Sequence, residues 1–325
     1  MNHLTTADPT TSIQTATRTN WDYQRGLWLA NFRSDKTRQA YADGWNVFGA
    51  FMGGMVTPDQ ITQDHVIAYK LHLENATSAR TGKPISRATI NQRISALSSF
   101  YAWLVGRGLL PVNPCDGVTR QAISPYGRAT FLDTDTRQDC TLLDVIDPTT
   151  LQGKRDRAIV LLFLTSGIRV GVIPQLTVGS IRGCGSKICL YYVNKGGEEV
   201  QAELAPETAA AIADYLAARG DTDQTSALFI ATRGRKGRAA ALTGRGVHAL
   251  VVSYCDKAFG VGHGIHPHSL RHTAAQAAIS EGFSITEVSR LLKHKSLAVT
   301  TLYLHATDRA DGKIARKLGR RYSRD

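Results

Sequence analysis

The chain has 325 residues, of which 42% are hydrophobic and 20% charged, so it is long enough for two domains and is not typical of a disordered protein. Lys and Arg number 39 against 27 Asp and Glu, and the formal charge of +12 indicates a polyanionic partner, nucleic acid first, although a generally basic soluble protein has the same balance. The longest apolar run, residues 158–164, is far too short to span a bilayer, so we expect no membrane partner.

Cysteine usage bears on the cellular compartment. The five cysteines are an odd count without a Cys-x-x-Cys pair, so we expect reduced thiols rather than a disulfide framework. The Thr-rich N-terminus lacks the apolar segment of a signal peptide. These features predict a cytoplasmic, nucleoid-associated protein.

The N-terminal part is predicted to be a helical domain over residues 20–115, after a mobile arm over residues 1–19 that lacks periodicity. Ser34 is a suitable N-cap for one helix, residues 62–74 predict a second, and Ser86 opens a third. The first and third helices carry apolar stripes that we interpret as core: Tyr41, Trp45, Phe48, Phe51, Ile90, Ile94, Leu97, Tyr101 and Leu104.

Basic and amide side chains lie near the starts of the first and third helices. Side chains of these types contact phosphates and base edges when a helix enters the major groove of DNA. A solvated helix face is the plainer explanation for any one of them. Together with the C-terminal pattern described below, we favour DNA contact for Lys36, Arg38, Arg87, Asn91 and Arg93.

A linker rich in Gly, Ser and Pro is predicted over residues 116–127, and a second domain over residues 128–307. The apolar run in this domain predicts a buried helix that ends near Gly167. A hairpin with its turn at Asn194-Lys195-Gly196-Gly197 is predicted from strands over 186–193 and 199–204, beside helices over 131–146, 208–219 and 246–258. A Gly-broken loop adds further DNA-binding candidates: Arg235, Lys236 and Arg238.

The stretch from His266 to His305 holds the strongest pattern. Pro267 suits the first turn of a helix, on which His268 and Arg271 share a face because they are three residues apart. Ser284-x-x-Glu287 is a capping box that starts the next helix. The stretch can thus present two imidazoles, one guanidinium and one phenol: His268, His294, Arg271 and Tyr303.

These residues resemble the C-terminal signature of the tyrosine recombinases, the phage integrase family. His268-x-x-Arg271 has the family's spacing, and the contexts Leu-Leu-Lys-His294-Lys-Ser and Thr-Thr-Leu-Tyr303-Leu-His are similar to it. Ser-Gly-Ile-Arg169-Val resembles the motif around the family's first arginine, and Lys195 matches its β-hairpin lysine.

The resemblance continues in the N-terminal part, where Ser-x-x-Thr-x-x-x-Tyr41 and Asn113-Pro114 are similar to motifs of the SAM-like, core-DNA-binding domain. It implies a mainly α protein with a small antiparallel β-sheet, made of a SAM-like domain and a tyrosine-recombinase catalytic domain of the DNA breaking-rejoining fold. The simple layout is like that of Xer or Cre recombinases. The tail over residues 308–325 is expected to dock on a neighbouring subunit or to be a frayed basic end.

The reaction implied by the resemblance is DNA cleavage and rejoining through a 3′-phosphotyrosyl intermediate, without a cofactor or metal. Tyr303 is the expected nucleophile, and His268 can take its proton, since a phenol has a pKa of about 10. Lys195 can protonate the departing 5′-oxygen, and His294 can donate a hydrogen bond to the phosphate. Forked guanidinium groups suit the phosphate oxygens. The implied catalytic set is Arg169, Lys195, His268, Arg271, His294 and Tyr303.

The expected substrate is double-stranded DNA with specific recombination sites, bound by a homotetramer, with an accessory protein as an open requirement and integration, excision or resolution as the role. A type IB-like topoisomerase or strand transferase, and a non-catalytic DNA-binding regulator, are the alternatives. A metal-dependent nuclease is disfavoured because the spacing of the histidines at 263, 266, 268 and 272 matches no common zinc pattern. Val172 and Ser180 stand where relatives often carry acidic residues, and Pro174 interrupts the helix expected after Arg169.

Overall fold

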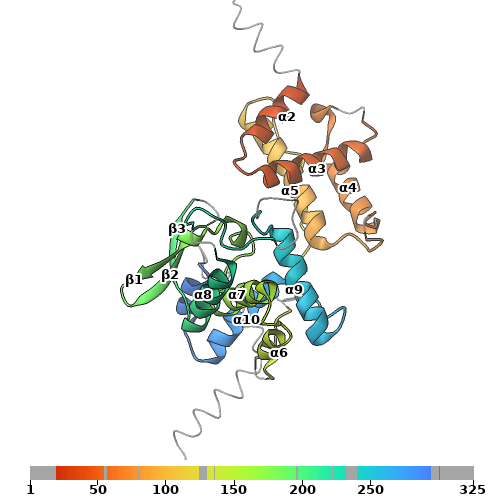
Figure 1. The fold of residues 1–325 in the computed structure, drawn as a ribbon. Coiled ribbons are helices and arrows are strands. Elements are labelled where there is room, and N and C mark those ends of the chain that lie inside the picture. The colour runs from red at the N-terminus through yellow and green to blue at the C-terminus, as the bar shows by residue number, and fades with distance from the viewer. Residues whose placement is uncertain are drawn as a thin grey trace, which may run out of the picture. The chain divides into compact units, whose positions relative to one another are not determined.

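The structure is a computed structural model that describes residues 20–54, 57–79, 81–123, 130–134, 136–194, 197–220, 223–231, 240–293 and 300. Its contacts divide the chain into two compact units, residues 1–124 and 125–325 (Figure 1). The limits expected from the sequence, with an arm, a linker and a tail, remain predictions. No helix among the described ranges is long and apolar enough to cross a membrane.

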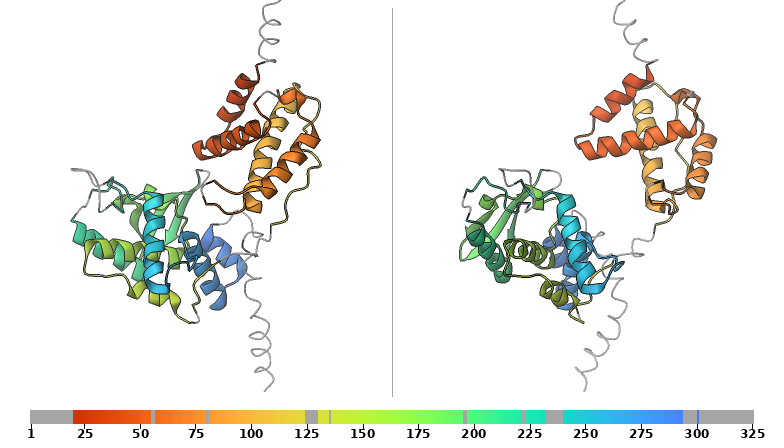
Figure 2. Two further views of the ribbon diagram at one scale, coloured as in Figure 1. Left: turned by 90° about the vertical axis from the view of Figure 1, so that its right-hand side faces the viewer. Right: turned by 45° about the vertical axis from the view of Figure 1, so that its right-hand side comes forward.

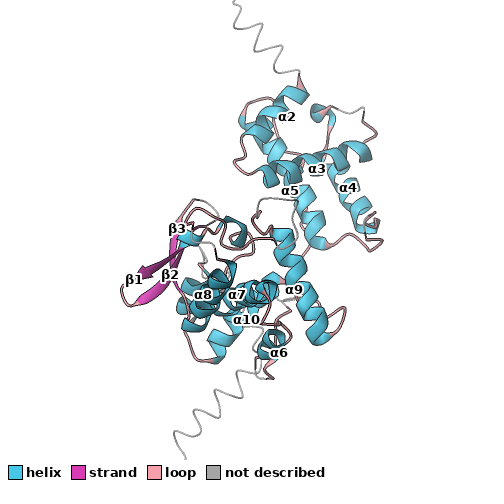
Figure 3. Ribbon diagram, in the orientation of Figure 1, coloured by secondary structure: helices cyan, strands magenta, loops and turns pink. Residues whose placement is uncertain are grey.

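The N-terminal unit contains four α-helices in its described residues, drawn in cyan in Figure 3. They are α2 (Trp21–Ala30), α3 (Asp35–Phe51), α4 (Gln63–Asn75) and α5 (Arg87–Gly106), with a short 3-10 turn, η1 (Pro58–Gln60), before α4. The serines predicted as N-caps do this: Ser34 Oγ accepts from Thr37 N–H and Ser86 Oγ from Thr89 N–H. Local capping therefore places the helix starts where the sequence predicts them.

Helix α5 is the centre of this unit, because it packs against α2, α3 and α4. Its apolar stripe is buried as predicted, and aromatic rings from the other helices cover it, with Trp45 and Phe100 centroids 4.5 Å apart. Close approach of α3 requires Gly44, since a Cβ there would lie 2.9 Å from the Cβ of Ala96. The aromatic residues at helical spacing are therefore core, as predicted.

Residues after α5 are held against its first turns. The side-chain amide of Asn91 donates to the carbonyl of Gln121 and accepts from its N–H, both at 2.9 Å. Arg87 Nη1 donates to the carbonyl of Ala122 at 3.2 Å. The first part of the segment predicted as a linker is thus attached to the N-terminal unit.

The second unit is mainly helical with one small sheet, shown in two further views in Figure 2. Its helices are α6 (Gln138–Asp144), α7 (Leu151–Ser166), α8 (Pro206–Arg219), α9 (Gly244–Phe259), α10 (Pro267–Ser280) and α11 (Ile285–Leu292). Two 3-10 turns, η2 (Ile173–Gln175) and η3 (Val178–Ser180), follow α7. Helix α7 is buried along most of its length and packs against both α8 and α10, so it is the centre of the core of this second unit.

The sheet has the strand order β1-β2-β3 and is antiparallel throughout: β1 (Ile181–Cys184), β2 (Lys187–Val193) and β3 (Glu199–Glu203). The predicted hairpin is β2 and β3, with Val193 paired to Glu199 across the turn. Strand β1 was not predicted, because Arg182 and Gly183 give it no alternating pattern. It pairs Cys184 with Lys187 and so begins the sheet.

Two further predictions were wrong in detail. The helix predicted over residues 131–146 is only α6, because Arg137 at its N-cap has a left-handed backbone with φ of 58°. The prediction of reduced thiols was wrong for two cysteines, since Cys184 and Cys189 form a disulfide with Cα atoms 5.9 Å apart. Cys189 lies two residues beyond the β1-paired Lys187, which places it diagonally across from Cys184 on the same face.

Candidate active site

Helix α10 presents two of the predicted catalytic residues. Pro267 is in its first turn, and the N-cap is His266, whose Nδ1 accepts from the N–H of Ser269 at 3.4 Å. One turn into the helix, Arg271 is 3% exposed while His268 remains exposed. The two residues therefore lie on one helix face, as predicted. The guanidinium of Arg271 is on the buried side of that face, and the imidazole of His268 is on its exposed side.

Arg169 follows directly after the end of α7. That helix ends at Gly167, whose φ of 58° is left-handed and favours glycine. Arg169 Nη1 donates to the side-chain oxygen of Asn194 at 3.0 Å, and Nη2 donates to the carbonyl of Lys293 at 3.2 Å. One guanidinium thus connects the ends of β2 and α11.

Arg271 makes a parallel set of contacts. Its Nη1 donates to the carbonyl of Gly167, and its Nη2 donates to the carbonyl of Leu292 at 2.5 Å. The carbonyl end of a helix carries partial negative charge, so the two guanidinium groups are stabilised at the end of α11. Together, Arg169 and Arg271 hold three chain segments at one point.

A phenol lies in the same electrostatic environment. Burial raises the pKa of Tyr192, and the positive charges of Arg169 and Arg271 act against that rise. Tyr192 is on β2, two residues before Asn194, and is half-buried. It is therefore a protonated phenol near the paired arginines, which no sequence pattern indicated.

Imidazole rings line the outer edge of α10. The ring of His266 lies nearly parallel to that of His268, with centroids 6.4 Å apart, and His268 meets His272 edge-on at 4.4 Å. Partial desolvation, followed by the charges of Arg271, His266 and Arg169, lowers the pKa of His268 below 6.5. The imidazole of His268 is therefore neutral at pH 7 and able to accept a proton.

The histidines considered as a metal cluster are arranged otherwise. His263 Nε2 lies 3.1 Å from Asp256 Oδ1, away from the row on α10. Among the residues that the structure describes, no group of three or more His, Cys, Asp or Glu side chains is arranged to hold a metal ion.

Three of the predicted catalytic residues, Lys195, His294 and Tyr303, lie outside the described residues. The residues directly before Lys195 and His294 are described. Asn194 directly precedes Lys195 and is buried against Arg169, and Lys293 directly precedes His294. Asn194 was missed from the sequence, although a polar residue next to the predicted hairpin lysine was an available signal.

The departures from the family pattern have structural roles. Val172 is 4% exposed in the core, and its N–H donates to the carbonyl of Arg169 at 2.9 Å. Ser180 Oγ accepts from the N–H of Thr177 at 3.1 Å. Pro174 lies in η2, so a 3-10 turn replaces a continued helix after Arg169.

The DNA-binding candidates of the N-terminal unit differ in their contacts. Lys36 and Arg38 are exposed in the first turn of α3, and Arg38 forms an ion pair with Asp35 at 2.9 Å. Arg93 is half-buried, whereas Arg87 and Asn91 bind the backbone after α5 as described above. The basic-loop candidates Arg235, Lys236 and Arg238 lie outside the described residues.

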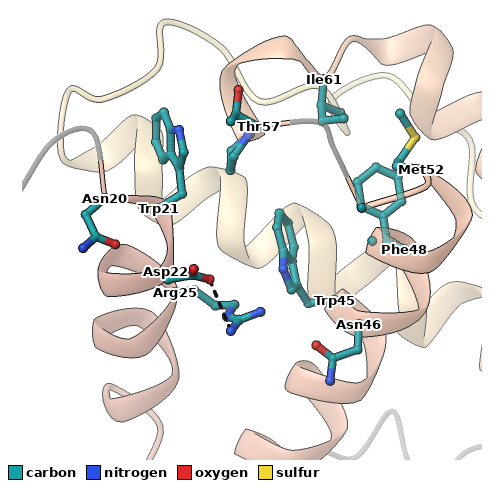
Figure 4. Close-up of a pocket in the computed structure, with 13 residues that line it drawn as sticks. Asn20, Trp21, Asp22, Arg25, Trp45, Asn46, Phe48, Met52, Thr57 and Ile61 are labelled. Carbon is teal, nitrogen blue, oxygen red and sulfur yellow. Dashed lines mark ion pairs between the residues drawn. The ribbon is translucent and has the colours of Figure 1, made fainter.

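A hollow of about 670 Å³ lies in the N-terminal unit between α2, α3 and η1 (Figure 4). Trp21 and Trp45 line it, and Asp22 forms an ion pair with Arg25 at 3.4 Å beside them. Both indoles also pack against the aromatic core. The hollow contains none of the predicted catalytic residues.

Comparison with known proteins gives the chain its family. The model of the phage integrase family matches residues 134–310, and that of the phage integrase N-terminal SAM-like domain matches residues 21–108. The chain is 29% identical over 281 residues to a tyrosine recombinase XerC of Pelobacter propionicus, covering 84% of this chain and 86% of the relative. It is 32% identical over 237 residues to a tyrosine recombinase XerC of Thermodesulfovibrio yellowstonii, covering 68% and 72%.

Solved structures share the fold. The site-specific recombinase XerH bound to a palindromic difH substrate, in a post-cleavage complex, matches with a TM-score of 0.67 and 17% identity, over 86% of this chain and 78% of that one. A lambda integrase dimer bound to a COC′ core site matches with a TM-score of 0.64 and 16% identity, over 92% and 81%. The family match covers more than half of the chain, and the protein belongs to the phage integrase family.

Proposed function

We propose that this protein is a site-specific DNA recombinase of the tyrosine type, which cleaves and rejoins DNA through a 3′-phosphotyrosyl intermediate. The observation that carries the proposal is the convergence of Arg169 and Arg271 on the carbonyl end of α11, directly before His294. Membership of the phage integrase family and relatives named tyrosine recombinases support the same reaction.

The two arginines bind the scissile phosphate. In-line displacement at a phosphodiester leaves negative charge on the nonbridging oxygens, so fixed positive charge stabilises the transition state. Each guanidinium has five N–H donors in a rigid fork. The contacts of Arg169 with Asn194 and Lys293 occupy two of these N–H groups, so further donors are available for phosphate oxygens.

Tyr303 is the nucleophile. Its phenol oxygen forms a bond to the scissile phosphorus, the bond from phosphorus to the 5′-oxygen breaks, and the protein is left joined to the 3′-phosphate. His268, neutral at pH 7, accepts the phenolic proton. Lys195 gives a proton to the departing 5′-oxygen, and His294 donates to the phosphate. The phosphotyrosyl bond keeps the energy of the phosphodiester, so another 5′-hydroxyl can reverse the step.

DNA recombination sites are the substrate, and the protein acts as a tetramer on two paired sites. The lambda integrase tetramer bound to a Holliday junction, with a TM-score of 0.63, supports this assembly by its fold. The DNA-binding side chains of the N-terminal unit are Lys36, Arg38 and Arg93, and those of the basic loop are Arg235, Lys236 and Arg238. Arg87 and Asn91 contact DNA if the segment after α5 moves to release them.

The experiment is trapping of the covalent intermediate on nicked duplexes, which lose a short strand on cleavage. The duplexes are selected by binding from a randomised library. The parent protein should form an adduct that resists denaturation, and Tyr303→Phe should form none. Tyr192→Phe is the matched control, because its phenol also lies near the arginines. An adduct that survives Tyr303→Phe and disappears in Tyr192→Phe would contradict the assignment.

A further inference from the structure

Lys293 has an unusual backbone for its residue type. Among the residues that the structure describes, only Lys293 and Arg137 have a positive φ without being glycine, and Lys293 has φ of 50° and ψ of 51°. A side chain in the left-handed region crowds its own backbone, so glycine is favoured at such a helix end. An outlier of this kind at a candidate site is a reason to look for a function.

The position of Lys293 joins it to the paired arginines. Its carbonyl accepts from Arg169 Nη2 at 3.2 Å, and the preceding carbonyl, of Leu292, accepts from Arg271. Its N–H donates to the carbonyl of Arg290 at 3.2 Å, which closes the last turn of α11. The backbone of Lys293 is thus fixed beside the two arginines, and the residue is half-buried.

The end of α11 is already stabilised by two cations without the Lys293 charge. A cation near a helix C-terminus ordinarily stabilises the helix dipole. Here the two guanidinium groups already bind the terminal carbonyls of α11. Among the described residues, Lys293 forms no ion pair, and Glu287 of the same helix caps Ser284 at the opposite end.

We propose that Lys293 is a further phosphate-binding residue, whose ammonium group contacts the nonbridging oxygens of the DNA backbone beside the phosphate held by Arg169 and Arg271. Bound DNA supplies the negative charge that the cluster lacks, so a phosphate contact of the ammonium group offsets the unfavourable backbone in the complex. The inference rests on the proposed function, since it requires DNA at this site.

The test compares stability with DNA binding in the full chain. Lys293→Gly removes the left-handed strain and the charge together, so its Tm should rise by about 2 °C. Its affinity for a fluorescein-labelled duplex of arbitrary sequence should fall about five-fold at moderate salt. The slope of log affinity against log salt concentration should become shallower by about 0.9, the loss of one phosphate contact. Lys293→Arg should keep the parent slope.

Arg137→Gly is the matched control. It removes one positive charge and one left-handed residue, but at the N-cap of α6, where the Arg137 side chain binds Cys140 Sγ. This variant should gain stability with an unchanged salt slope. The inference is overturned if Lys293→Gly keeps the parent affinity and slope, or if its Tm falls. If such a result comes with a parent protein that still forms the Tyr303 adduct, only this inference is refuted. A parent protein that forms no adduct refutes the proposed function itself.

Discussion

Gly167 and Leu292 are in contact across the candidate site: a Cβ added to Gly167 would lie 2.5 Å from Leu292 Cδ2. Gly167 also needs its positive φ to end α7, and its carbonyl accepts from Arg271. The absence of a side chain at this position therefore allows α7 and α11 to meet where the arginines lie.

Gly167→Ala should lower both stability and cleavage. The left-handed backbone and the contact with Leu292 together should cost about 2 kcal/mol in the free energy of unfolding. Chemical denaturation measures this loss, and adduct formation measures the effect on the site. Gly171→Ala is the control, because no atom lies within 4 Å of a Cβ there. Equal stability of the two variants would contradict the role given to the Leu292 contact.

Asn194→Ala should slow cleavage without unfolding the protein. The variant loses the oxygen that accepts from Arg169 Nη1 at 3.0 Å, so the guanidinium is less well oriented toward the phosphate. Loss of such orientation slows reactions roughly 10- to 100-fold. Single-turnover adduct formation on the nicked duplex measures the rate, and Tm serves as the check on folding. Unchanged kinetics in a folded variant would remove Asn194 from the site.

Cleavage should depend on pH through His268. Its pKa is lowered, chiefly by partial desolvation and then by Arg271, so the neutral imidazole that accepts the phenolic proton persists at pH 7. The cleavage rate should be at its plateau at pH 7 and should fall on acidification only at a pH lower than an ordinary histidine would require, since protonation then removes the base. His268→Gln should be slow at every pH and lack this dependence. A parent rate that rises on acidification would contradict the assignment.

Reduction of the Cys184–Cys189 disulfide should destabilise the sheet. The bond closes a short loop between β1 and β2, and a cross-link of this span contributes about 2 kcal/mol by restricting the unfolded chain. Thermal unfolding with and without a reductant measures the difference. Cys184→Ser should have the Tm of the reduced parent both with and without the reductant. Mass analysis after thiol alkylation should find Cys184 and Cys189 unalkylated only in the oxidised parent. A parent insensitive to reductant would refute the contribution.

Features set by neighbouring residues could be predicted from the sequence. The capping serines Ser34, Ser86 and Ser284 mark helix starts because the hydrogen bonds they accept come from residues three positions later. The mainly α fold with a small antiparallel sheet was implied instead by the resemblance of the motifs around Arg169 and Arg271 to the tyrosine recombinases.

Features set by distant contacts could not be predicted. The helix predicted over residues 131–146 is shortened on its N-terminal side, where the N–H of Leu132 donates to Thr273 Oγ1 on α10 instead of continuing a helix. Asn194 contacts Arg169 only because the end of β2 lies beside the residues that follow α7. The pairing of Cys184 with Cys189 depends on a strand, β1, that has no alternating pattern.

Because Arg169 and Arg271 bind chain carbonyls in addition to their proposed role as phosphate ligands, alanine scanning at either position would mix two losses. An inactive Arg271→Ala protein would be equally consistent with a missing phosphate ligand and with a detached end of α11. A lysine at the same position keeps the positive charge but cannot form the bidentate hydrogen bonds of a guanidinium group. Only substitutions that separate charge from geometry can therefore assign what each arginine contributes to the reaction.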